Sequence, residues 1–88
     1  METETLEEKS IRRKLYRVLR KTGIDKESIQ PDASFIEDLD FDNVDWTIFT
    51  NFLERIFNIS VKDEELIKFE SVNDTLRYLK TELSFLSN

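Results

Sequence analysis

The sequence predicts that a long acidic loop ends and a helix begins within the segment Ala33-Ser34-Phe35-Ile36-Glu37-Asp38-Leu39-Asp40-Phe41-Asp42-Asn43-Val44-Asp45. Asp42 is a residue type that favours the N-cap of a helix, and Asp45 follows at the third helical position, as in an acidic variant of the capping box. We therefore expect a helix over residues 43–57. Residues 24–41 lack helical periodicity and predict a loop pinned to the core. The spaced apolar residues of this loop are Ile24, Ile29, Pro31, Phe35, Ile36 and Leu39.

A helical pattern precedes this loop. Residues 3–21 begin with glutamates and continue with lysines and arginines, an order that suits the helix dipole. Gly23 follows as a natural stop. One apolar stripe runs along the segment and comprises Ile11, Leu15, Val18 and Leu19.

Two further segments follow the helix over residues 43–57. Residues 63–69 predict a short helix or turn, and residues 72–86 predict a last helix with a 3.6-residue apolar stripe. Ser71 and Asp74 have the spacing of a capping box at the start of this last helix. The expected architecture is therefore all-α, with three good helices, one short helix and a long first loop.

Length and composition restrict the classes of function. The chain has 88 residues, which predicts one domain, and one Gly and one Pro argue against a β-rich fold. It has no Cys or His, which excludes disulfides and thiolate catalysis and removes the usual general base and nitrogen ligand for metals. We therefore expect no enzyme activity, no catalytic residue and no metal site. The N-terminus lacks the features of a signal peptide, so we expect a cytoplasmic protein.

Charge is divided sharply along the chain. The net charge is −6, from 13 basic and 19 acidic residues, so we expect neither nucleic acid nor a membrane as a general partner. Residues 9–21 nevertheless hold seven basic residues, whereas residues 24–54 hold nine acidic residues and one basic residue, a local net of −8. These runs are either solvated faces or two binding surfaces of opposite sign, for partners or for head-to-tail contact between copies.

The string Phe35-Ile36-Glu37-Asp38-Leu39, followed by two residues and Asp42-Asn43-Val44-Asp45, resembles the acyl carrier protein family. The pattern of that family is Phe-x-Glu-Asp-Leu, a two-residue spacer, and Asp-Ser-Leu-Asp at the start of the second helix. Further matches follow without a gap at Phe57-Asn58-Ile59-Ser60-Val61 and Phe69-Glu70-Ser71-Val72, so the resemblance covers roughly residues 8–83. It implies a single domain over residues 1–88 folded as a small four-helix bundle with a long first loop and a short third helix.

The resemblance places Asn43 where the family carries 4′-phosphopantetheine on a serine. An amide nitrogen is not nucleophilic and cannot form the phosphodiester that the serine hydroxyl forms. The nearby hydroxyls do not replace it, because Ser34 lies in the loop and Thr47 and Thr50 lie one and two turns into the helix. We therefore expect Asn43 to be a non-functional attachment position and the protein to carry no cofactor.

The second helix departs from the family as well. Its apolar residues form two rows at about 100° per residue, which together span more of the helix circumference than one core-facing stripe needs. One row is Val44, Ile48, Phe52 and Ile56; the other is Phe49, Leu53 and Phe57, with Trp46 beside it. Either the helix is rotated and both rows are core, or one row is exposed as a partner or dimer surface. The apolar positions that help to line the family's acyl pocket fall on the polar residues Thr47, Thr50 and Asn51. An acyl-binding interior like that of the family is therefore less expected here.

Three other patterns have competing interpretations. Asp38-x-Asp40-x-Asp42 has the spacing of the first ligands of a calcium loop, but Asn43 stands where Gly is needed and Phe49 where the bidentate Glu is needed. Asp38 and Asp42 then fix the loop and cap the helix. The basic row of Arg13, Arg17, Arg20 and Lys21 has little aromatic interleaving for RNA, and Trp46 is either a core residue or fills the space of a pantetheine arm.

The leading hypothesis is a carrier-like binding module that has lost its attachment site and keeps protein–protein recognition. The partners would be fatty-acid or polyketide enzymes that read carrier proteins, or a second copy of the chain. The expected docking residues are Asp38, Asp42, Asp45, Trp46, Ile48, Phe52 and Ile56. The alternatives are a genuine acyl or peptidyl carrier with covalent 4′-phosphopantetheine, and a regulatory or structural domain unconnected with acyl metabolism.

Overall fold

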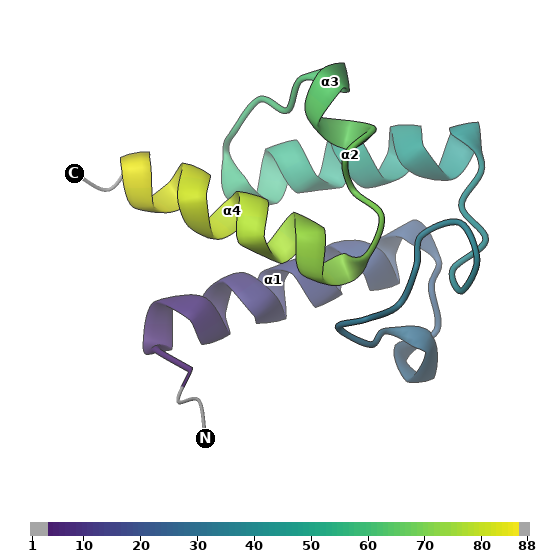
Figure 1. Ribbon diagram of the computed structural model, residues 1–88, viewed down its shortest axis with the longest axis horizontal. Helices are drawn as coiled ribbons and strands as arrows, with labels where there is room; N and C mark the ends of the chain where they lie inside the picture. Colours follow the sequence, from purple (N-terminus) through teal and green to yellow (C-terminus); the bar gives the residue numbers. More distant parts are fainter. Residues whose placement is uncertain (1–3, 87–88) are drawn as a thin grey trace.

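The computed structural model describes the backbone of residues 4–86 and the side chains of residues 4–83. Its elements are α1 (Leu6–Thr22), a short 3-10 helix η1 (Lys26–Ser28), α2 (Asn43–Phe57), α3 (Asp63–Leu66) and α4 (Val72–Leu86). α1 packs against both α2 and α4. α1 runs along the lower edge of the molecule in Figure 1, and the short α3 lies at the upper edge. The fold is the predicted all-α four-helix bundle with a long first loop and a short third helix.

Capping boxes set the starts of the first two long helices. Thr5 and Glu8 each accept a hydrogen bond from the other's backbone N–H, at 3.1 and 2.9 Å, so α1 begins at Leu6 rather than at residue 3 as expected. Asp42 and Asp45 make the same reciprocal pair at 2.9 and 3.1 Å, and α2 begins at Asn43 as predicted. The two helices end at residues in the left-handed conformation, Gly23 and Asn58.

The third helix lies within the segment expected to be a short helix or turn. α3 ends at Leu66, and Ile67 to Phe69 continue as a turn whose backbone N–H groups bond back to residues 63–66. At the start of α4, the Asp74 carboxylate accepts hydrogen bonds from the backbone N–H groups of Glu70 and Ser71. Asp74 N in turn donates to the Ser71 hydroxyl at 3.4 Å, so the predicted cap of α4 is present.

The first loop is held against the core as predicted. Ile29, Ala33, Phe35, Leu39 and Phe41 are all buried. The backbone also ties the loop to the start of α4: Phe35 N donates to Glu70 O, and Val72 N donates to Ala33 O, both at 3.0 Å. Two expected anchors are wrong, because Pro31 is exposed and Ile36 points out of the core and is 61% exposed.

The apolar rows of α2 have different environments. Phe49, Leu53 and Phe57 are buried with Leu15, Val18 and Leu19 of α1 and with Leu79 of α4. In the other row, Phe52 and Ile56 are half-buried against this core, Ile48 is half-buried, and Val44 is exposed. The helix therefore buries one row fully and covers the other only in part.

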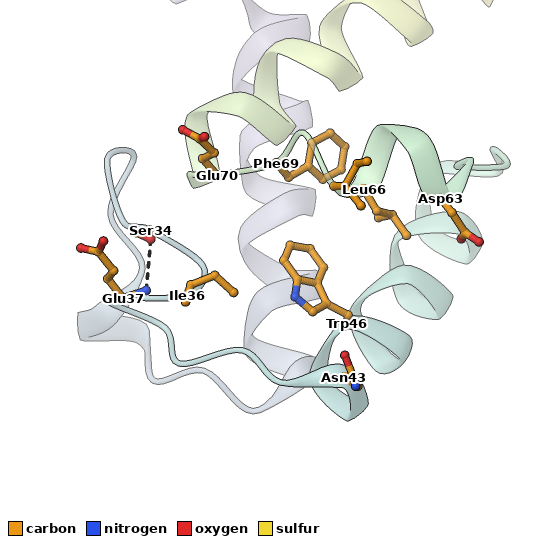
Figure 2. A pocket seen from close by; sticks show the side chains of 10 residues that line it. Ser34, Ile36, Glu37, Asn43, Trp46, Asp63, Leu66, Phe69 and Glu70 are labelled. Atoms are coloured by element: carbon orange, nitrogen blue, oxygen red, sulfur yellow. Dashed lines mark hydrogen bonds between the residues drawn. The ribbon is translucent and has the colours of Figure 1, made fainter.

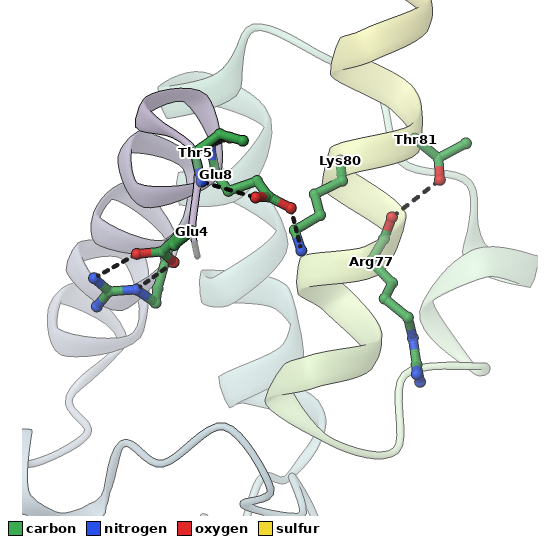
Figure 3. A network of polar contacts seen from close by, with 7 residues as sticks. Glu4, Thr5, Glu8, Arg77, Lys80 and Thr81 are labelled. Carbon is green, nitrogen blue, oxygen red and sulfur yellow. Dashed lines mark hydrogen bonds and ion pairs between the residues drawn. The ribbon is translucent and has the colours of Figure 1, made fainter. Parts of the chain in front are cut away.

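Ion pairs fasten the start of α1 to α4. Glu8 accepts from Lys80 of α4 at 3.0 Å, and Glu4 pairs with Arg12 at 2.9 Å (Figure 3). The backbone N–H of Thr5, together with Lys80, lowers the pKa of Glu8 from 4.5 to about 2. These contacts stabilise the deprotonated form of Glu8 in the folded chain.

Candidate functional site

An open pocket of about 750 Å³ lies beside the start of α2. The first loop, the first turn of α2, and α3 with its following turn form its walls (Figure 2). The lining residues are Ser34, Ile36, Glu37, Asn43, Trp46, Asp63, Leu66, Ile67, Phe69 and Glu70. Two of the predicted site residues, Asn43 and Trp46, therefore meet here.

An aromatic cluster fixes one wall of the pocket. The ring centroid of Trp46 lies 4.9 Å from that of Phe35, 5.0 Å from Phe41 and 5.9 Å from Phe49. Because Phe35 and Phe49 are fully buried, the indole is anchored from behind. Its other side faces the pocket, across from Ile36 and below Leu66 and Phe69 (Figure 2). Trp46 is thus both a half-buried core residue and a wall of the pocket.

Asn43 stands at the mouth of this pocket, as the first residue of α2, and is exposed. The hydroxyls near it are engaged in local hydrogen bonds. Thr47 Oγ1 donates to Asn43 O at 3.0 Å, and Ser34 Oγ accepts from Glu37 N at 3.1 Å. One turn further along, Thr50 Oγ1 donates to Trp46 O at 2.7 Å. The side chain at position 43 offers an amide and no hydroxyl.

The three predicted acidic docking residues all have local structural contacts. Asp38 Oδ2 accepts from Ser34 N at 2.7 Å and closes the first loop, while Asp42 and Asp45 cap α2. Within residues 4–83, no group of three or more His, Cys, Asp or Glu side chains is arranged to hold a metal ion. None of the described helices has the length and apolar character needed to cross a membrane.

Comparison with known proteins agrees with this geometry. Residues 16–79 match the family described as the phosphopantetheine attachment site. The chain is 32% identical over 72 residues to an acyl carrier protein of Nitratidesulfovibrio vulgaris (strain DSM 19637 / Miyazaki F), which covers 81% of this chain and 95% of that protein. It is 34% identical over 64 residues to an acyl carrier protein of Wolinella succinogenes, which covers 73% of this chain and 84% of that protein.

This chain belongs to the acyl carrier protein family. Members of this family are carrier proteins, so the expectation that the chain is not an enzyme is confirmed. The family carries 4′-phosphopantetheine as its prosthetic group. Covalent attachment needs a hydroxyl, and the amide of Asn43 does not fit that requirement.

The apolar surface beside the pocket of this acyl carrier family member includes residues that the sequence analysis did not select. Ile36 is 61% exposed and Ile67 is 83% exposed, and both line the pocket. Val44, next to Asn43, is also exposed. No local signal marks Ile67 as exposed, because adjacent apolar residues of a helix can both be buried, as Val18 and Leu19 are.

The predicted docking residues Ile48, Phe52 and Ile56 lie further along α2, outside the lining of the pocket. Phe52 is partly covered by Lys21 of α1, whose Nζ lies 5.7 Å from the ring centroid. Of the predicted docking residues, Trp46 alone is in the lining of the pocket, and the three predicted aspartates are outside it as well.

Proposed function

We propose that this acyl carrier family member acts through protein–protein recognition and does not carry 4′-phosphopantetheine. The observation that carries the proposal is Asn43 at the first position of α2, at the mouth of the pocket. An amide side chain cannot accept the prosthetic group through a phosphodiester. The rest of the fold, including both caps that flank the position, is intact.

The neighbouring hydroxyls support the absence of attachment. Thr47 and Thr50 donate their hydroxyl protons to backbone carbonyls of their own helix, which directs both hydroxyls back along α2. Ser34 lies across the pocket in the first loop, where its hydroxyl accepts a hydrogen bond from Glu37 N. None of these side chains stands at the start of α2 in place of residue 43.

The character of the pocket supports a docking role. Its apolar centre is made of Trp46, Leu66 and Phe69, and the exposed Ile36 and Ile67 extend it. The carboxylate-bearing residues on its lining are Glu37, Asp63 and Glu70. An apolar centre with a charged rim is the usual composition of a recognition surface. The partners that we propose are enzymes of the fatty-acid or polyketide type that read carrier proteins.

Intact-protein mass spectrometry tests this proposal. The chain, its Asn43→Ser variant and an Asn51→Ser control would each be incubated with coenzyme A and a broad-specificity phosphopantetheinyl transferase. Asn51 is exposed on the same helix but lies outside the pocket, so its serine should not be read as an attachment site. We expect only the Asn43→Ser variant to gain the mass of one phosphopantetheine group.

A second substitution tests the docking surface in the same assay. Adding Ile67→Glu to the Asn43→Ser variant should slow modification by about tenfold or more, because it places a charge on the apolar centre. Modification of the unaltered chain would show that it is a genuine carrier. An unmodified Asn43→Ser variant would show that carrier-reading enzymes no longer recognise the fold.

A further inference from the structure

A basic face runs along α1 on the side away from the core. Residues 9–24 contain no acidic residue. Six of their basic side chains are exposed and lie within an arc of about 140° at 100° per residue. They are Lys9, Arg13, Lys14, Arg17, Arg20 and Lys21. None of them forms an ion pair with any residue in the described part of the chain, and the arc lies opposite the buried Leu15 and Leu19.

An apolar side chain begins this basic face. Leu6 is the first residue of α1 and is 87% exposed, the most exposed large apolar side chain among the described residues. Its direction at 100° per residue falls inside the arc of the basic side chains, close to Arg13 and Arg17. The exposed face of α1 therefore carries one apolar anchor followed by about three turns with cations.

The pocket beside α2 has the complementary character. Its apolar centre is open, Glu37, Asp63 and Glu70 line it, and no lysine or arginine does. The pocket is formed by the first loop, the first turn of α2, and α3 with its following turn, and no residue of α1 lines it. Each copy of the chain thus presents an anchor with cations on one side and an apolar pocket with carboxylates on another.

We propose that α1 of one copy docks on this pocket of a second copy. Leu6 enters the apolar centre, and Lys9 and Arg13, which follow the acidic first turn of α1, face Glu37 and Glu70. Because the two surfaces lie on different sides of the molecule, the contact is head-to-tail and leaves each pair with one free surface of each kind. The contact rests on the proposal that Asn43 carries no phosphopantetheine, because Asn43 lines the pocket and an attached arm would add bulk and charge there.

Charge favours a second copy over an extended polyanion. The chain has a net charge of −6, which opposes its approach to nucleic acid or an anionic membrane. Repulsion between two copies is largely screened beyond about 8 Å at physiological ionic strength, whereas the facing patches are in contact. The carboxylates of the pocket provide a limited anionic surface with an apolar centre, which fits Leu6.

Two variants, each with one of the two contact surfaces blocked, test the contact by sedimentation velocity. Arg13→Glu with Arg17→Glu removes the basic face and keeps the pocket. Glu37→Lys with Glu70→Lys reverses the rim and keeps α1. All four side chains are exposed, and no hydrogen bond of the described chain involves them, so folding should be unaffected. A circular dichroism melt of each variant checks this.

The proposal predicts a specific pattern. The unaltered chain should form concentration-dependent dimers and longer chains that weaken as the salt concentration rises from about 0.1 M to 1 M, where the screening length falls to about 3 Å. Each blocked variant alone should be monomeric. A mixture of the two should associate again, because each surface of one variant then meets an oppositely charged surface of the other. Leu6→Ser should weaken the association of the unaltered chain about tenfold.

A matched control makes the same change in net charge at residues outside the basic face and the pocket. Lys26→Glu with Arg55→Glu also lowers the net charge by four, from −6 to −10, and should leave the association within about threefold of the unaltered chain. A monomeric unaltered chain at millimolar concentration would overturn the proposal, as would a mixture of blocked variants that stays monomeric. Binding of the monomeric chain to anionic vesicles or RNA through Arg13 and Arg17 would assign the basic face to a polyanion instead.

Discussion

Replacing Thr75 by valine is expected to stabilise the protein. Thr75 lies on the buried side of α4 between Val72 and Leu79 and is fully buried. Its hydroxyl oxygen has no hydrogen-bond partner within the described part of the chain. A buried polar group without a partner loses its hydration and gains nothing in return. Valine has nearly the same shape and replaces the hydroxyl by a methyl group.

The size of the effect follows from this burial. An unpaired buried hydroxyl costs about 1–3 kcal/mol of folding free energy. Threonine and valine have similar helix propensities, so the helix itself contributes little to the difference. We expect Thr75→Val to raise the free energy of unfolding by about 1–2 kcal/mol. For a chain of this length, each kcal/mol corresponds to about 4–8 °C in the melting temperature.

Urea unfolding followed by the fluorescence of Trp46 measures this difference. The midpoint should rise by about 0.5–1 M with an unchanged slope. Thr81→Val is the matched control, because Thr81 is exposed on the same helix and its hydroxyl donates to Arg77 O at 3.1 Å. That change should lie within about 0.5 kcal/mol of zero. Thr75→Ser keeps the hydroxyl, removes a buried methyl group and should destabilise by about 1 kcal/mol.

One result would refute this reasoning. If Thr75→Val lowers the midpoint at constant slope, the hydroxyl makes a hydrogen bond that stabilises α4. Thr75→Ser would then be less harmful than Thr75→Val. A stabilised Thr81→Val control would instead show that valine is favoured along the whole helix, independently of burial.

Three other changes have expected outcomes. Asp42→Ala removes one half of the capping box of α2 and should lower the free energy of unfolding by about 1 kcal/mol in urea titrations, whereas Asp40→Ala should not remove this cap. Trp46→Ala removes contacts with three aromatic rings and should lower the free energy of unfolding by about 2–3 kcal/mol, and Trp46→Phe should have an intermediate effect. Acidification from about pH 5 to pH 2 should lower the melting temperature, because the folded-state pKa of Glu8 is about 2 against an ordinary value of 4.5. The contribution of Glu8 is present above its ordinary pKa and is lost as pH falls toward the folded value, so Glu8→Gln should flatten this decline.

Local sequence signals predicted the helices whose ends carry capping motifs. The Asp42 and Asp45 pair places the start of α2 correctly because a capping box acts between residues that are close in sequence. The same motif at Thr5 and Glu8 marks the start of α1. The expected start at residue 3 rested on the acidic residues near the N-terminus rather than on this motif. Residues 63–69, expected to form a short helix or turn, contain a helix followed by a turn, and apolar residues alone do not place the boundary between the two.

Burial of single residues was less predictable. Ile36 and Ile67 have the composition of core residues but are exposed, because the positions of the loop and of α3 relative to α2 depend on tertiary packing. Thr75 shows the opposite case, a polar residue buried because α4 turns that position toward the core. The pocket itself joins residues between 34 and 46 to residues between 63 and 70, so no local pattern could predict its lining.

The chemistry at position 43 is physically separable from the fold. Asn43 is exposed, and the hydrogen bonds that begin α2 are made by Asp42 and Asp45 on either side of it. Asparagine and serine have similar, modest helix propensities, so exchanging them leaves the cap and the core unchanged. A difference in modification between the two chains therefore reports on the presence of a nucleophile. A failure of both chains to be modified reports on the surface that the transferase must read, which is formed by the pocket and the first turn of α2.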